Sequence, residues 1–305
     1  KQTLDYFMGL QVETEHINDE IHIQQDINAF RSSLVYDCIE RAMDLVEGGS
    51  VYSADGGPTA GTISAGDSLA ALDEIVFNQK LLTMEQVLHA MSTNYEDMET
   101  VPAGPEIRAI LLNKAPKFGN DDERADKWVV ELEDYIGSSY RYKYRSSKYG
   151  KGPVPCCYSY SQSPVTGNIA FGKSIGATPD GRKAGQPVNN GISPANGSEK
   201  KGATAACNSV MKLPSIWFQK GAIFNMRLSK GALDTDENKE KVIAMIKVLF
   251  ENYGQQIQFN VVDNKVFKKA MEHPDEYKDL MVRVSGYSAL FTSLSPECQM
   301  DVINR

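Results

Sequence analysis

A single glycine interrupts an apolar, strand-like run near the carboxyl end of the chain. Residues 281–284 are mostly apolar, Ser285, Gly286, Tyr287 and Ser288 follow, and residues 289–291 begin apolar again. Glycine weakens a strand because it has no side chain to pack and more backbone freedom to lose than other residues. A bulge or tight loop is therefore the ordinary interpretation of Gly286.

The composition predicts a folded protein that binds neither nucleic acid nor a membrane. With 305 residues, 41% of them hydrophobic, the chain can bury a sizeable core in one large domain or two smaller ones. It has 32 basic and 40 acidic residues and no concentrated basic stretch. No run approaches the roughly 18 apolar residues of a membrane helix, and no signal peptide is recognised. We expect a cytoplasmic location, with the interior of a bacterial microcompartment as an alternative.

The cysteines and histidines predict neither a disulfide framework nor a metal site. The odd number of cysteines and their scatter favour reduced thiols. There is no CxxC motif, and the histidines lack the spacing of metal ligands. The residues concerned are Cys38, Cys156, Cys157, Cys207 and Cys298, and His16, His22, His89 and His273.

Hydrophobic periodicity predicts helices in the first half of the chain and alternating helices and strands in the last third. We expect the second helix to be capped by Asp67 or Ser68. Residues 152–214 are dense in glycine, proline and small polar residues, and such long irregular segments are usually functional or form a packed interface. The whole pattern favours an α/β fold. The predicted helices cover 29–47, 67–77, 84–92, 121–135, 236–253, 265–272 and 274–279, the predicted strand covers 256–262, and a further helix opens at 295–297.

Four motifs, in this order along the chain, resemble the glycyl radical enzymes of the pyruvate formate-lyase-like superfamily. They read SPVTGNIAFGK at 163–173, GATPDGRKAGQP at 176–187, QFNVV at 258–262 and RVSGY at 283–287. The resemblance covers essentially the whole chain. It implies the carboxy-terminal part of a ten-stranded α/β barrel with surrounding helices and a central glycyl radical loop. Residues 1–175 would belong to the barrel domain and residues 176–305 to the glycine radical domain.

The resemblance also assigns roles to individual residues. Gly286 would store the radical, because loss of a hydrogen from its α carbon leaves a planar radical that a side chain would crowd. Arg283, Val284, Ser285 and Tyr287 would hold and shield the loop. Residues 163–172 would form a strand and turn on the active-site side of the barrel, either as a substrate wall or as a structural strand; the candidate wall residues are Val165, Thr166, Asn168 and Phe171.

The family's hydrogen-abstracting cysteine is not matched in this sequence. Many branches carry a Cys-x-Glu pair, and the chain has none. Cys156 and Cys157 are adjacent, as in pyruvate formate-lyase, but they lie downstream of the expected thiyl loop, so we interpret them, like the other cysteines, as structural. The cysteine and the acid/base residues are therefore expected upstream of Lys1, on a longer chain or a second subunit, and residues 1–305 alone are expected not to turn over substrate.

The resemblance implies an eliminating lyase or dehydratase acting on a small hydroxylated metabolite, closest to the hydroxyproline and diol dehydratase branch. A carbon–carbon lyase, formate acetyltransferase or decarboxylase is the first alternative, and a spare-part protein that rescues an oxygen-cleaved enzyme is the second. No cofactor is expected in this chain, because the radical resides on the protein backbone. A separate activating enzyme with S-adenosylmethionine and an iron–sulfur cluster would install it. The other expected partners are the cysteine-bearing part, a small-molecule substrate and further copies of the complete enzyme in a homodimer or larger assembly.

Overall fold

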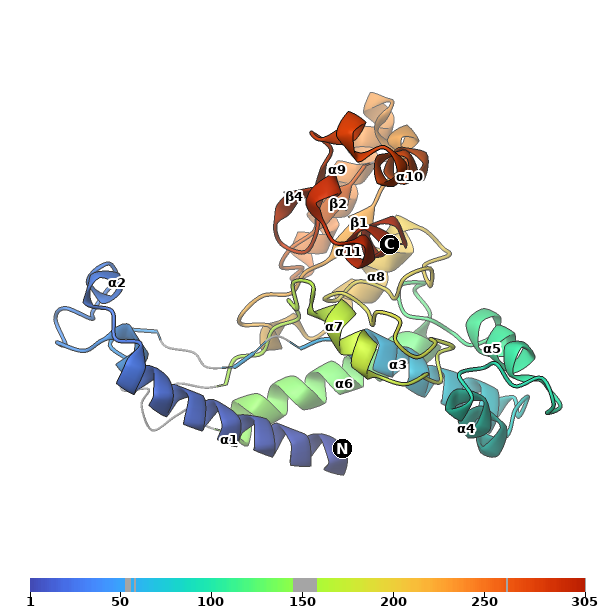
Figure 1. Cartoon of the computed structure of the whole chain (residues 1–305), viewed down its shortest axis with the longest axis horizontal. Helices are drawn as coiled ribbons and strands as arrows, with labels where there is room; N and C mark the ends of the chain where they lie inside the picture. Colours follow the sequence, from blue (N-terminus) through green and yellow to red (C-terminus); the bar gives the residue numbers. More distant parts are fainter. Residues whose placement is uncertain (53–55, 58, 145–157, 262, 305) are drawn as a thin grey trace. The chain divides into compact units, whose positions relative to one another are not determined.

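The computed structural model of this chain describes residues 1–52, 56–57, 59–144, 158–261 and 263–304 (Figure 1). These residues form two compact units, each made of segments that are far apart in the sequence. The first unit consists of residues 1–58, 133–161 and 216–220, and the second of 59–132, 162–215 and 221–305. Among the described residues, every helix is too short or too polar to cross a bilayer.

The first unit is helical and has a core of tyrosine rings. It contains α1 (Gln2–Gln25), α2 (Ala29–Ser33), the short 3₁₀ helix η1 (Leu45–Glu47) and the second half of α6 (Glu123–Tyr142). The ring of Tyr140 lies 6.2 Å from that of Tyr158 and 6.1 Å from that of Tyr160. Tyr160 also donates a hydrogen bond of 2.6 Å to Glu133, so its buried hydroxyl is satisfied.

The predicted helix over 29–47 is wrong in its middle. α2 ends at Ser33, and turns follow as far as η1. The cause is Asp44, a buried carboxylate that needs partners. It accepts hydrogen bonds from the Ser32 hydroxyl at 2.7 Å and the Asn28 backbone N–H at 3.0 Å. A continuous helix would carry Asp44 more than ten residues along the axis from both donors, so the chain turns back instead.

Most helices of the second unit agree with the predicted ranges. α4 (Met84–Ser92) coincides with the prediction, and the first helix is α3 (Thr62–Ala71), which continues as the π-helical segment η2 (Leu72–Asn78). The predicted cap at Asp67 or Ser68 is wrong, because Gly61 is the N-cap and both residues lie inside the helix. α5 (Gly104–Asn113) and α8 (Ala203–Met211) complete this set and were not predicted.

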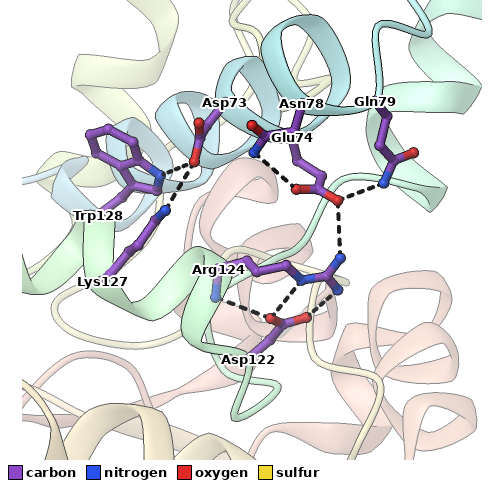
Figure 2. A network of polar contacts seen from close by, with 8 residues as sticks. All are labelled: Asp73, Glu74, Asn78, Gln79, Asp122, Arg124, Lys127 and Trp128. Carbon is purple, nitrogen blue, oxygen red and sulfur yellow. Dashed lines mark hydrogen bonds and ion pairs between the residues drawn. The ribbon is translucent and has the colours of Figure 1, made fainter.

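The π-helical segment η2 is joined to the start of α6 by charged side chains (Figure 2). Lys127 approaches Asp73 at 3.0 Å, and the Trp128 indole donates to the same carboxylate at 3.3 Å. Arg124 bridges Glu74 at 3.2 Å and Asp122 at 2.7 Å. We call these side chains the surface ion network, because Arg124 and Lys127 are 54% and 48% exposed.

Four short strands lie in the last part of the second unit. β1 (Asn225–Arg227) and β2 (Gln258–Asn260) pair in parallel, connected through α9 (Asp236–Glu251). β3 (Met281–Arg283) and β4 (Ser288–Leu290) form an antiparallel hairpin. The strand and helices predicted here are confirmed in type. The remaining elements are η3 (Ser215–Trp217), η4 (Lys230–Leu233), α10 (Asn264–Glu272), η5 (Pro274–Tyr277), η6 (Phe291–Ser293) and α11 (Pro296–Asn304).

A compact apolar cluster anchors the β3–β4 hairpin. Val282 and Val284 pack with Phe267 of α10, Phe291 of η6 and Val302 of α11, all almost fully buried. The rings of Phe267 and Phe291 lie 4.8 Å apart, within the usual range for aromatic pairs. One face of the hairpin is thus packed on this cluster, through side chains that alternate with the exposed residues of its strands.

The strand expected over 163–172 is wrong, because helix α7 (Gly167–Ser174) occupies most of it. The Gly167 N–H donates to the Pro164 carbonyl at 2.7 Å, which closes a turn just before the helix. Just before this stretch, Gln162 pairs with a neighbouring segment through a parallel bridge to Ala222. The described residues therefore have a mixed α/β fold with two two-stranded sheets, and the ten-stranded barrel stays a prediction.

Candidate functional site

Gly286 lies at the tip of the β3–β4 hairpin. A hydrogen bond of 2.9 Å from the Val284 N–H to the Tyr287 carbonyl closes the turn. The φ angle of Gly286 is +82°, in the left-handed region where residues with a side chain are strained. A Cβ at this position would also lie 3.3 Å from the Ile223 Cδ1 atom. Both the turn and the close neighbour therefore favour glycine here.

Both polar groups of Gly286 have side-chain partners. Its N–H donates to the Gln258 Oε1 atom at 3.1 Å, and its carbonyl accepts from the Arg283 Nη2 atom at 3.3 Å. Arg283 also donates to the Ser288 hydroxyl at 3.1 Å, across the hairpin. The glycine backbone is thus held on both sides of its α carbon, although the residue itself is exposed.

Asn260 of β2 ties the hairpin to the parallel pair. Its Oδ1 atom accepts from the Arg283 N–H at 2.9 Å, and its Nδ2 atom donates to the Arg283 carbonyl at 2.8 Å. One side chain thereby satisfies both backbone groups of a strand residue. These two hydrogen bonds fix the position of the hairpin relative to β2, the strand that also carries Gln258.

The predicted loop residues divide into buried and exposed members. Val284 and Ser285 are buried, and the Ser285 hydroxyl donates to the Asn190 Oδ1 atom at 2.9 Å. Tyr287 is exposed, at 39%, and Arg283 is half-buried. Val284 and Ser285 therefore anchor the loop, whereas Tyr287 and Arg283 flank the glycine at the surface.

The predicted wall residues lie at the start of α7 in different environments. Asn168 is fully buried, Val165 and Phe171 are 46% and 51% exposed, and Thr166 is half-buried. The Val165 carbonyl accepts from the Asn190 Nδ2 atom at 3.1 Å, which brings this segment to the same residue that anchors Ser285. Their contact with substrate stays a prediction.

Four buried polar residues, three near the loop and one on α11, were missed by sequence reasoning. Gln258 was noticed only as part of a strand motif, and the others had no motif at all. Their shared signal is a polar side chain inside an otherwise apolar or irregular segment, which needs buried partners. They are Asn190, Asn225, Gln258 and Asp301.

A cavity of about 650 Å³ lies in the second unit beside α7 and α11. Asp301 and Asp67 line it, together with Lys117, whose ammonium group donates to the Asp180 carbonyl at 2.7 Å. Burial raises the pKa of Asp67 to about 7, although the Phe118 N–H donates to it at 2.7 Å. Its Oδ2 atom has no hydrogen-bond partner. Asp67 therefore titrates near neutral pH.

The described cysteines and acidic residues do not form a reactive cluster. Within the described ranges, no group of histidine, cysteine and acidic side chains is placed to hold a metal ion. Burial raises the pKa of Cys207 to about 11 and also raises the pKa of Cys38, so both thiols are protonated at neutral pH. Cys298 is half-buried in α11, and Cys156 and Cys157 lie outside the described residues.

Family comparison decides which kind of loop this is. The pyruvate formate lyase-like family matches residues 1–171, and the glycine radical family matches residues 188–292, which include the hairpin and Gly286. The chain belongs to the glycyl radical enzymes. The family predicted from the sequence motifs is thereby confirmed.

Several relatives of this glycyl radical chain are dehydratases. It is 36% identical to the probable dehydratase YbiW of Escherichia coli over 98% of its own length and 36% of that protein. It is 33% identical to trans-4-hydroxy-L-proline dehydratase of Clostridioides difficile over 100% of its length and 37% of that protein. The chain thus spans little more than a third of the length of these curated relatives.

A solved structure of similar fold concerns 1,2-propanediol dehydration in Roseburia inulinivorans. The chain matches it with a TM-score of 0.92 and 35% identity, covering 100% of this chain and 38% of that one. These neighbours in sequence and in structure are thus all named for dehydration.

Proposed function

We propose that this chain carries the radical, on Gly286, of an anaerobic glycyl radical lyase that removes water from a small hydroxylated metabolite. The observation that supports it most is the held backbone of Gly286, with its N–H on Gln258 and its carbonyl on Arg283. A glycyl radical is planar and delocalised over these two groups. The two contacts hold the two groups over which the unpaired electron would be delocalised.

Loss of one hydrogen atom, a proton together with an electron, from the Gly286 α carbon creates the radical. The acceptor of that atom is supplied by a separate activating enzyme, which uses S-adenosylmethionine and an iron–sulfur cluster. Arg283 and Tyr287 then flank the radical.

We further propose that the radical is relayed to substrate through a cysteine outside residues 1–305. The cysteine thiol gives its hydrogen atom to Gly286, and the resulting thiyl radical takes a hydrogen atom from a substrate carbon. A hydroxyl group then leaves as water with a proton from an acid, while a base takes a proton from the substrate radical, and the thiol returns a hydrogen atom to the neutral product radical. The lack of a Cys-x-Glu pair in residues 1–305 supports a supply from elsewhere.

Dehydration is preferred because of what the relatives are named for. They include a probable dehydratase, a trans-4-hydroxy-L-proline dehydratase and a structure of 1,2-propanediol dehydration. Val165, Thr166, Asn168 and Phe171 are proposed to approach the substrate side. Residues 1–175 would belong to the barrel domain, residues 176–305 would form the radical domain, and the complete enzyme would assemble as a dimer or larger.

Electron paramagnetic resonance of the complete enzyme after anaerobic activation tests this proposal. We expect a doublet from the wild type and none from Gly286→Ala. Gly202→Ala is the matched control: Gly202 has a φ of +85°, nothing lies near its would-be Cβ, and it is outside the loop. This control should keep the doublet. Air exposure of the activated wild type should cleave the chain at Gly286, as seen by mass spectrometry. A doublet that survives in Gly286→Ala, or an uncleaved chain, would contradict the proposal.

A further inference from the structure

A series of hydrogen bonds between buried side-chain amides begins at the Gly286 N–H. That group donates to the Gln258 Oε1 atom at 3.1 Å. The Gln258 Nε2 atom donates to the Asn225 Oδ1 atom, and the Asn225 Nδ2 atom donates to the Asn190 Oδ1 atom at 3.2 Å. These residues lie on β2, on β1 and in the loop before α8, so the series crosses three segments of the second unit.

The series continues from Asn190 to a carboxylate. The Asn190 Nδ2 atom donates to the Asn168 Oδ1 atom at 3.1 Å. The Asn168 Nδ2 atom donates to the Asp301 Oδ1 atom at 3.3 Å. We call Gln258, Asn225, Asn190, Asn168 and Asp301 the amide relay. It ends on α11, the helix that packs beneath the hairpin.

The two ends of the amide relay determine the direction of every bond in it. A backbone N–H can only donate, so the end of Gln258 that faces Gly286 must be its oxygen. An ionised carboxylate can only accept, so the end of Asn168 that faces Asp301 must be its nitrogen. Each intermediate amide then has one possible orientation, and all donors point from Gly286 toward Asp301.

Hydrogen bonds that all point in one direction polarise the amide groups they join. A carboxylate that accepts from an amide N–H makes the oxygen of that amide a stronger acceptor, and the effect passes along a chain of hydrogen bonds. The relay residues are buried, Asn168 completely and Asp301 to all but 3%, so little water screens the effect. The Gln258 oxygen is therefore a stronger acceptor for the Gly286 N–H than an isolated amide would be.

We propose that the amide relay tunes the stability of the radical on Gly286, with Gln258 as its positioning residue. This inference rests on the proposed function. The radical is stabilised by electron donation from the glycine nitrogen and withdrawal by its carbonyl. An acceptor on the N–H increases the donation, and the Arg283 guanidinium on the carbonyl increases the withdrawal. The two contacts, one on each side of the α carbon, therefore both stabilise the radical.

The radical in protein labelled with ¹⁵N-glycine, in the complete activated enzyme, tests the relay directly. Gln258→Leu removes the acceptor, so we expect a changed nitrogen hyperfine coupling and a radical half-life under nitrogen that is about threefold to tenfold shorter, as loss of one hydrogen bond implies. Asp301→Asn keeps an accepting oxygen but removes the charge. It should shift the coupling in the same direction by a smaller amount.

Asn189→Leu is the matched control for this experiment. Asn189 is as buried as the relay residues and loses two hydrogen bonds, to the Ser64 N–H and the Gly191 carbonyl, but it is outside the relay. It should leave the coupling and the half-life unchanged. A wild-type coupling and half-life in Gln258→Leu would overturn the relay. If that variant does not fold, a wild-type coupling in the conservative Asp301→Asn would overturn it. Absence of any doublet from the wild type would instead contradict the proposed function.

Discussion

The amide relay and the surface ion network both join distant segments through polar side chains, but with different groups. The relay uses neutral amides with one terminal carboxylate, all buried. The surface ion network uses three carboxylates, paired with the cations Arg124 and Lys127, which are about half exposed (Figure 2). The relay lies beneath the candidate radical loop, whereas the ion network ties η2 to α6.

Desolvation explains this difference. An ionised side chain is costly to bury unless it is paired and hydrogen-bonded, whereas an amide can be buried once its donor and acceptor are satisfied. Exposed ion pairs avoid that cost but gain little, because water and salt screen them. Rigid positioning near Gly286 is therefore built from amides, and the one relay charge, Asp301, accepts from both Asn168 and Asn196.

Three carboxylates show the same contrast in their pKa values. Burial raises the pKa of Asp67 to about 7. Hydrogen bonds from Gln79 lower the pKa of Glu74, and hydrogen bonds from Arg124 lower the pKa of Asp122. Asp67 thus favours folding when it is protonated, and the two surface carboxylates favour it when they are ionised.

The largest effect on stability is expected from breaking the relay at Asn168. Asn168→Leu leaves the Asn190 amide and the Asp301 carboxylate without their shared partner, so it should cost about 2–4 kcal/mol of unfolding free energy. Denaturant unfolding measures this. Asn78→Leu is the matched control. Asn78 donates to Glu74 of the surface ion network at 3.4 Å, and because Asn78 is exposed this variant should change stability by less than about 0.5 kcal/mol. Equal losses in the two variants would remove the contrast between the networks.

A pH-dependent effect is expected at Asp67. Its pKa is 3.8 as the ordinary value and about 7 in the folded protein, so the folded state binds more protons between these values and stability falls as the pH rises through this window. Asp67→Asn keeps the acceptor for the Phe118 N–H and removes the charge. The free energy of unfolding of this variant, relative to that of the wild type, should be about 2 kcal/mol larger at about pH 8 than at about pH 5.

Melting curves at the two pH values measure this difference. Glu74→Gln serves as the control, because the lowered pKa of Glu74 gives the opposite sign. The ionised Glu74 carboxylate stabilises the fold above its ordinary pKa, and this contribution is lost as the pH falls through its pKa in the folded protein. Glu74→Gln should therefore be slightly less stable than the wild type at neutral pH and equally stable in acid. An Asp67→Asn advantage that does not depend on pH would show that Asp67 does not titrate in this window.

The smallest effect is expected at Arg124. Arg124→Gln removes the ion pairs to Glu74 and Asp122 and should cost less than about 1 kcal/mol, because the guanidinium is 54% exposed. The loss should shrink as salt is added, since the Debye length falls to about 3 Å at 1 M. Thermal unfolding at low and high salt measures it. A loss of stability as large as that of Asn168→Leu, and unchanged by salt, would show that the surface ion network behaves energetically like a buried network.

Local interactions made some elements predictable. The helix at 84–92 carries its own start signal, a capping box between Thr83 and Gln86, so its range follows from neighbouring residues. The hairpin glycine was visible as a break in an apolar run. The helix expected over 29–47 failed because Asp44 finds its partners sixteen and twelve residues earlier in the chain. The strand expected over 163–172 failed because a turn at Pro164 starts α7.

The sequence by itself determined the family and predicted the place of the candidate radical loop, because only glycine suits the conformation and the chemistry expected at Gly286. The amide relay was decided by the tertiary structure. Its members come from α7, the loop before α8, β1, β2 and α11, separated by up to 133 residues along the chain. A single asparagine carries no periodic signal of its own, and its role depends on which distant donor or acceptor folding brings within hydrogen-bond reach.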